Sequence, residues 1–137
     1  MKTSAAALAA LVVLAGCGAG GTLDPEALQK EAESVQSLAA EGALLARDVA
    51  DGKSTVPFTR VHAGELHEQA LKLEHTLSEA RATPAVEGEL AQTVAVIDDV
   101  VATLDQLQQA PGDSELARGA QRKLEQAAKK AERLAGS

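Results

Sequence analysis

Four runs of apolar residues, spaced alternately four and three positions apart, are the feature that most constrains how this chain folds. The first run comprises Leu28, Ala32, Val35, Ala39, Gly42, Ala46 and Val49. This spacing places the apolar side chains on one face of an α-helix, whereas a half-buried strand would alternate at every second residue. The sequence therefore predicts an all-α fold, with helices at roughly residues 25–51, 57–82, 84–110 and 113–135.

Each predicted helix begins where a residue suited to capping a helix stands close to the first apolar position. Side-chain oxygens of Asp, Ser and Thr accept hydrogen bonds from the free N–H groups of a first helical turn, and proline is tolerated there. The first helix is expected to stop at Asp51-Gly52, because glycine readily adopts the left-handed conformation that follows many helices. The predicted starts are Asp24-Pro25, Ser54-Thr55 before Pro57, Thr83-Pro84, and Asp113 or Ser114.

The connections between the predicted helices are only a few residues long, which forces successive helices to run in opposite directions. We therefore expect an up-down-up-down antiparallel four-helix bundle over residues 24–137. The segments that begin at residues 24, 53, 83 and 113 have net charges of −5, 0, −5 and +2. In this topology the basic fourth helix lies between the acidic first and third helices, and opposite charges favour that arrangement.

The composition narrows the classes of function. A chain of 137 residues suits one domain. It has no tryptophan or tyrosine and a single phenylalanine, Phe58, which we expect to plug one end of the bundle. The formal net charge of −7 argues against nucleic acid as a partner, because phosphate binding requires a basic surface.

The first 17 residues have the features of an export signal. A short start with one positive charge, Met1 to Ser4, precedes an apolar stretch, Ala5 to Leu14, that is too short to cross about 30 Å of hydrocarbon as a helix. The stretch ends in Leu14-Ala15-Gly16-Cys17, which resembles the lipobox of bacterial lipoproteins. The resemblance implies that Cys17 is the lipid attachment site, with diacylglyceryl transfer to its sulfur, cleavage before it and acylation of the new amino terminus.

The alternative is a plain signal peptide, cut nearby, that leaves an unmodified cysteine. We favour lipidation because Cys17 is the only cysteine, and a free thiol is a liability in an oxidising compartment. The chain then divides into a signal peptide at 1–16, the lipidated cysteine with a flexible tether at 17–23, and the bundle. The lipid anchors it to the extracytoplasmic face of the cell membrane or to the outer membrane. The resemblance to lipoproteins further implies that the outer membrane is favoured where there are two, because Gly18 stands where an aspartate can retain lipoproteins in the inner membrane.

All three histidines, His62, His67 and His75, lie on the second predicted helix. They are too far apart around or along the helix for any two to share a metal ion, and the Glu-x-x-His pairs of di-iron bundles are absent. His62 and Glu65 are three residues apart and share a face, and Asp48 of the first helix is expected to lie near them. We expect His62 to be partly buried and to donate an N–H to Asp48. A small ligand or metal carrier that uses these three residues is the alternative function.

The sequence predicts neither an enzyme nor a cofactor. It contains no paired nucleophile and base, no glycine-rich phosphate loop and no EF-hand spacing. Residues 41–66 are similar to stretches of uncharacterised exported helical proteins of high-GC bacteria, a resemblance that implies no activity. We therefore expect a non-catalytic interaction or structural bundle in the cell envelope. Its partner would be another envelope protein or a second copy of the chain, met by the acidic faces of the first and third helices.

Overall fold

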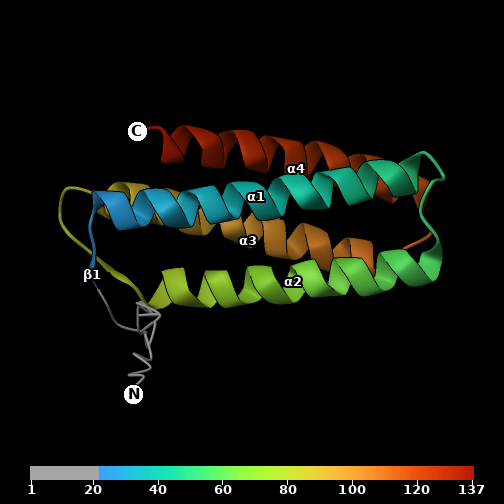
Figure 1. Ribbon diagram of the computed structural model, residues 1–137, viewed down its shortest axis with the longest axis horizontal. Helices are drawn as coiled ribbons and strands as arrows, with labels where there is room; N and C mark the ends of the chain where they lie inside the picture. Colours follow the sequence, from blue (N-terminus) through green and yellow to red (C-terminus); the bar gives the residue numbers. More distant parts are fainter. Residues whose placement is uncertain (1–21) are drawn as a thin grey trace, which may run out of the picture.

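The computed structural model describes residues 22–137, in which four α-helices lie side by side around one apolar core (Figure 1). The all-α prediction is therefore confirmed. The predicted signal peptide, Cys17 and residues 18–21 lie outside the described residues. The elements are β1 (Thr22–Leu23), α1 (Pro25–Ala50), α2 (Val56–Glu79), β2 (Arg81–Ala82), α3 (Glu87–Gln109) and α4 (Ser114–Ala135).

Three of the four helix starts are capped as the sequence predicts. Their side-chain oxygens accept hydrogen bonds from backbone N–H groups three residues on, at 2.8 Å for Asp24, 3.4 Å for Thr55 and 3.0 Å for Asp113. Each bond satisfies one of the N–H groups that a first helical turn leaves free. The stop after α1 is also confirmed, because Gly52 follows the last helical residues with φ +69°.

The start of α3 was predicted wrongly, since the helix begins at Glu87 and not at Thr83-Pro84. β1 pairs in parallel with β2, and the N–H of Thr83 donates to the carbonyl of Leu23 at 3.2 Å. This pairing holds residues 81–83 extended, so a helix cannot form until the chain has turned. It also fixes residue 22 at the end of the bundle where α1 begins and α2 ends (Figure 1).

The helices are packed unevenly. α1 packs most closely on α4 and α2 on α3, whereas contacts between α1 and α2 are much sparser. α4 buries mainly alanines, with Leu124 as its largest buried side chain, and short side chains allow close approach to α1. α4 also contacts α3, while α2 and α4 share no contacts among the described residues. Figure 1 accordingly shows α4 at one side of the bundle and α2 at the other.

Candidate functional site

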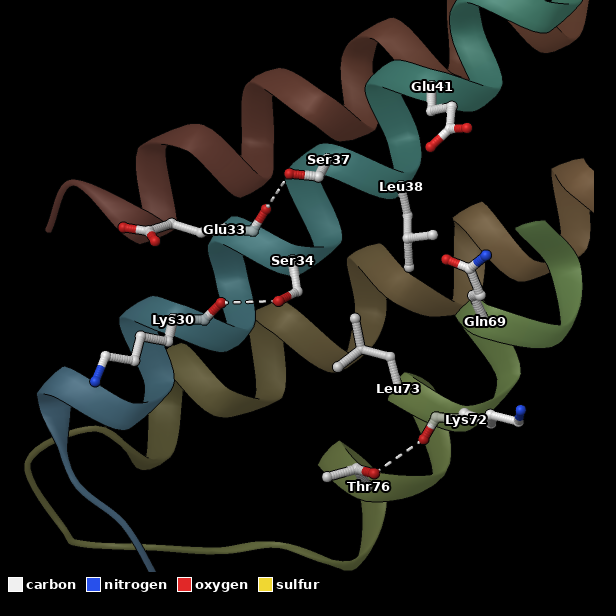
Figure 2. A pocket seen from close by; sticks show the side chains of 10 residues that line it. All are labelled: Lys30, Glu33, Ser34, Ser37, Leu38, Glu41, Gln69, Lys72, Leu73 and Thr76. Atoms are coloured by element: carbon white, nitrogen blue, oxygen red, sulfur yellow. Dashed lines mark hydrogen bonds between the residues drawn. The ribbon is translucent and has the colours of Figure 1, made fainter. Parts of the chain in front are cut away.

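A groove of about 770 Å³ lies between α1 and α2, where the packing is sparse. In Figure 2 Leu38 of α1 and Leu73 of α2 point toward one another across it, and both are at least half-buried. The rest of the lining is polar and includes three short side chains, Ser34, Ser37 and Thr76, besides longer charged and amide side chains. The three short side chains leave space between the helices that larger apolar residues would fill.

The hydroxyl groups of the groove are already engaged within their own helices. Each donates to the backbone carbonyl four residues earlier, at 3.1 Å for Ser34, 3.0 Å for Ser37 and 2.9 Å for Thr76 (Figure 2). A hydroxyl that already donates its hydrogen to a backbone carbonyl can act toward a ligand only as a hydrogen-bond acceptor. Donors to a ligand would come from the ammonium groups of Lys30 and Lys72 and from the amide of Gln69.

His62 lies just beyond the groove, and its ring is 28% exposed. Its Nε2 is 3.3 Å from a carboxylate oxygen of Glu41, and its Nδ1 is 3.7 Å from one of Glu65. The partly buried position and the neighbouring Glu65 agree with the sequence. The predicted partner Asp48 is wrong, because Glu41, on the same face of α1 but earlier in the chain, takes that place. The prediction assumed that residues of α1 and α2 at equal distances from the connection lie opposite each other. The contact between His62 and Glu41 shows instead that the two helices are offset along their axes.

The two carboxylates approach His62 from different sides. Because Glu41 meets one ring nitrogen and Glu65 the other, a metal ion bound to either nitrogen would find only one of these carboxylates beside it. Within residues 22–137 no group of three or more His, Cys, Asp or Glu side chains is placed to hold a metal ion. His75, the third histidine, pairs with Glu79 at 3.4 Å on the surface. The sequence predicted that a ligand or metal carrier would use Asp48, His62 and Glu65. Of these three residues, the structure brings together two, His62 and Glu65.

Phe58 does not plug the bundle end, and this expectation is wrong. The side chain is 59% exposed and stacks on the His62 ring, with centroids 5.5 Å apart and planes inclined by 25°. The buried position at this end belongs to Thr59, whose hydroxyl is bonded to the carbonyl of Thr55 at 2.8 Å and to the Ser54 hydroxyl at 2.7 Å. Sequence reasoning assigned the bulkier neighbour to the core and overlooked these local hydrogen bonds.

Phe58 and His62 continue the side of α2 that lines the groove. They are four residues apart, and Gln69, Leu73 and Thr76 follow at helical spacing on the same side. Val61, 62% exposed, lies at the outer edge of this side. We call the groove together with Phe58, Val61, His62, Glu41 and Glu65 the α1–α2 face.

The chain matches no protein-family model, and comparison with curated proteins and with solved structures gives no match either. None of the helices within residues 22–137 combines the length and the apolar character needed to cross a bilayer. The function therefore has to be argued from the α1–α2 face and from the sequence signals.

Proposed function

We propose that this protein is an extracytoplasmic lipoprotein, anchored to the membrane through Cys17, whose helical bundle binds a partner protein and performs no catalysis. The lipobox resemblance of residues 14–17 supports the anchor. The proposed topology is up-down-up-down and antiparallel. It is supported by the connections between successive helices, which lie at alternating ends of the molecule (Figure 1). The first described residue lies at one end of this bundle, so the anchor holds the bundle by that end.

The observation that carries the proposal is the exposure of Phe58 beside an open groove. The chain has no other phenylalanine, tyrosine or tryptophan, and the fold leaves more than half of this side chain in water. Aromatic side chains supply much of the binding energy at protein interfaces, and a large exposed apolar residue is informative where it stands next to a concave surface. The α1–α2 face therefore has both an anchor residue and a groove.

The chemistry of the α1–α2 face indicates the kind of partner. Between Lys30 and Glu41 the groove follows α1 for about 16 Å, or three helical turns. Glu41 and Glu65 make its far end acidic, next to apolar Phe58 and Val61. An amphipathic helix with apolar residues toward the groove and basic residues at its rim fits these features.

This surface differs from the one expected from the sequence. The acidic faces of the first and third helices were expected to act together, but the outer sides of α1 and α3 are separated by α2 and α4 (Figure 1). Of the two acidic helix faces expected from the sequence, only that of α1 contributes to the α1–α2 face. The acidic residues of α3 belong to a different side of the molecule.

Crosslinking in cells tests the proposal. A photoreactive amino acid placed at Gln69, in the groove, is expected to give one dominant adduct, either with an envelope protein or with a second copy of the chain. The same substitution at Gln92, an exposed glutamine of α3, is the matched control and should not give that adduct. Phe58→Ser should abolish the adduct. Equal adducts from both positions, or none from Gln69, would contradict the binding face.

The anchor is tested separately. The Cys17→Ala chain should incorporate no labelled fatty acid and should give less of the adduct, because no lipid chain holds the bundle beside its partner. Fatty-acid incorporation into the Cys17→Ala chain at the wild-type level would contradict lipidation at this residue.

A further inference from the structure

The outer side of α4 concentrates positive charge in an otherwise acidic protein. Six of the chain's 13 lysines and arginines lie on this helix, and all six side chains are exposed. We call them the basic face of α4: Arg118, Arg122, Lys123, Lys129, Lys130 and Arg133. The proposed binding of a partner at the α1–α2 face makes no use of them.

The six cations form two rows. Arg118, Arg122, Lys129 and Arg133 recur at helical spacing on the side of α4 away from the core, over about 22 Å. Lys123 and Lys130 form a second row that borders α3. Glu125 and Glu132 lie at the edge of this face toward α1, where they line a groove together with Lys129, and Glu115 lies in the first turn. Cations therefore outnumber the carboxylates of this helix six to three, and the carboxylates lie at the margin toward α1 and in the first turn.

Carboxylates of α3 lie near part of this face, since Asp99 lines a pocket with Lys123 and Lys130, and Glu89 lines one with Arg133. Across residues 22–137 no ion pair within 4.0 Å involves a side chain of α4. The buried side of α4 is mostly alanine, which secures the helix by close packing, while the long cationic side chains project into solvent. These charges are consequently available to an external anion.

We propose that the basic face of α4 docks on the anionic headgroups of a lipid bilayer. This inference rests on the proposed anchor, which keeps the bundle beside a membrane. A row of cations along about 22 Å of α4 suits an extended anionic surface, and a basic patch is the second signal that commonly accompanies a lipid chain in stable membrane attachment. The C-terminus of α4 lies at the same end of the bundle as β1, so the basic face begins near the point where the anchored chain enters the fold (Figure 1).

The net charge of the protein does not prevent this contact. At physiological ionic strength charges are screened beyond about 8 Å, and neighbouring helix axes are already about 8 to 10 Å apart. The acidic helices α1 and α3 both pack against α4, whereas α2 lies across the bundle from it (Figure 1). With α4 on the bilayer, α2 is on the far side, and the α1–α2 face remains accessible to a partner.

Vesicle binding by the purified mature chain, which begins at residue 17 and carries Cys17→Ser, tests the inference without a lipid anchor and without the apolar stretch of the signal peptide. We expect binding to phosphatidylcholine vesicles that contain about a third of phosphatidylglycerol, and none to phosphatidylcholine alone. Each lysine or arginine near an anionic surface contributes about fivefold in affinity, so replacing Arg122, Lys129 and Arg133 with glutamine should weaken binding roughly 100-fold. Arg122→Lys with Arg133→Lys should retain it.

The matched control variant removes the same number of positive charges, but from α2 and from the connection that precedes it. Lys53→Gln, Arg60→Gln and Lys72→Gln, all at exposed positions, should leave vesicle binding within about twofold of the starting chain, because the lost charges lie beyond the screening length. Circular dichroism of both triple variants checks that the helices remain folded. Inorganic phosphate, compared with chloride at equal ionic strength, should not release the protein, since the proposed ligand is a surface and not a free anion.

Three outcomes would overturn the inference: equal binding to both kinds of vesicle, an equal loss in the two triple variants, or release by phosphate alone. None of them depends on lipidation or on a partner. Failure of the anchor is seen instead in the incorporation of labelled fatty acid, compared between the wild-type and Cys17→Ala chains in cells, so the two proposals fail separately.

Discussion

Phe58 stacks on His62 at the surface of α2, with ring centroids 5.5 Å apart. The imidazole is in turn placed between the carboxylates of Glu41 and Glu65. The two helices thus hold a polar ring that supports an exposed aromatic one. Because this arrangement lies outside the core, its contribution to binding can be separated from its contribution to stability.

Phe58→Ala should therefore cost little stability. More than half of the ring is already in water, so we expect the free energy of unfolding to fall by less than about 1 kcal/mol. Leu66→Ala, at a position that is 1% exposed on the same helix, should cost about 2 to 5 kcal/mol. Urea unfolding measures both changes. A loss for Phe58→Ala as large as that for Leu66→Ala would mean that Phe58 belongs to the core.

Gly42 and Gly64 should respond differently to the same substitution. A Cβ at Gly42 would lie 3.0 Å from Leu104 and 3.1 Å from Leu124, both fully packed in the core. Overpacking of this kind costs about 1 to 3 kcal/mol and exceeds the helix propensity gained, about 1 kcal/mol, so Gly42→Ala should be destabilising. At Gly64 the atom closest to an added Cβ is the amide nitrogen of the Gln108 side chain, which is free to move. Gly64→Ala should therefore be neutral or stabilising.

Thermal and urea unfolding of the two alanine variants decide between these expectations. Gly42→Ala should have the lower melting temperature of the pair. The reverse order would show that the contact between α1 and the leucines of α3 and α4 adjusts more easily than its distances indicate.

The local signals of the sequence predicted the helices well. The apolar spacing and the capping residues depend only on near neighbours, which is why Asp24, Thr55 and Asp113 were found as caps. The start of α3 was missed because it depends on Leu23, far away in the sequence, which pairs with the segment after α2. Two-residue strands have no periodicity that a pattern search could detect.

The candidate site was predicted only in part, for a related reason. His62 and Glu65 are neighbours on one helix, so their proximity follows from helical spacing. The partner from α1 depends on the offset between two helices, which the sequence does not encode in any simple pattern. Glu41 was therefore missed, and so was the exposure of Phe58, because Thr59 occupies the buried position through hydrogen bonds to residues 54 and 55.

Thr83→Val should stabilise the protein. The Thr83 hydroxyl is buried and has no hydrogen-bond partner among the described residues, so a methyl group of similar shape should raise the free energy of unfolding by about 1 kcal/mol. Thr59→Val is the matched control, because that hydroxyl is bonded twice and its removal leaves Ser54 without its partner. Thr59→Val should lose about 1 to 2 kcal/mol. Losses of equal size in both variants would contradict the account of Thr83.

Glu31 should make stability depend on pH. Partial burial at the start of α1 raises the pKa of this carboxyl above its ordinary value of 4.5. As the pH rises through that value, the unfolded chain loses the proton first while the folded chain keeps it, so the folded state binds more protons and stability falls. The decline ends once Glu31 is ionised in both states. Its contribution is therefore most favourable at low pH and least favourable at neutral pH.

Glu31→Gln removes this titration and should be more stable than the wild type at neutral pH. Because solvent screens a partly exposed carboxylate, we expect a gain of only about a few tenths of a kcal/mol near pH 7, shrinking toward zero near pH 4. Urea unfolding at the two pH values measures it, with Glu68→Gln as a control at an exposed position of α2. The desolvation of Glu31 is refuted if its substitution changes stability equally at both pH values, or if Glu68→Gln produces the same pH-dependent gain.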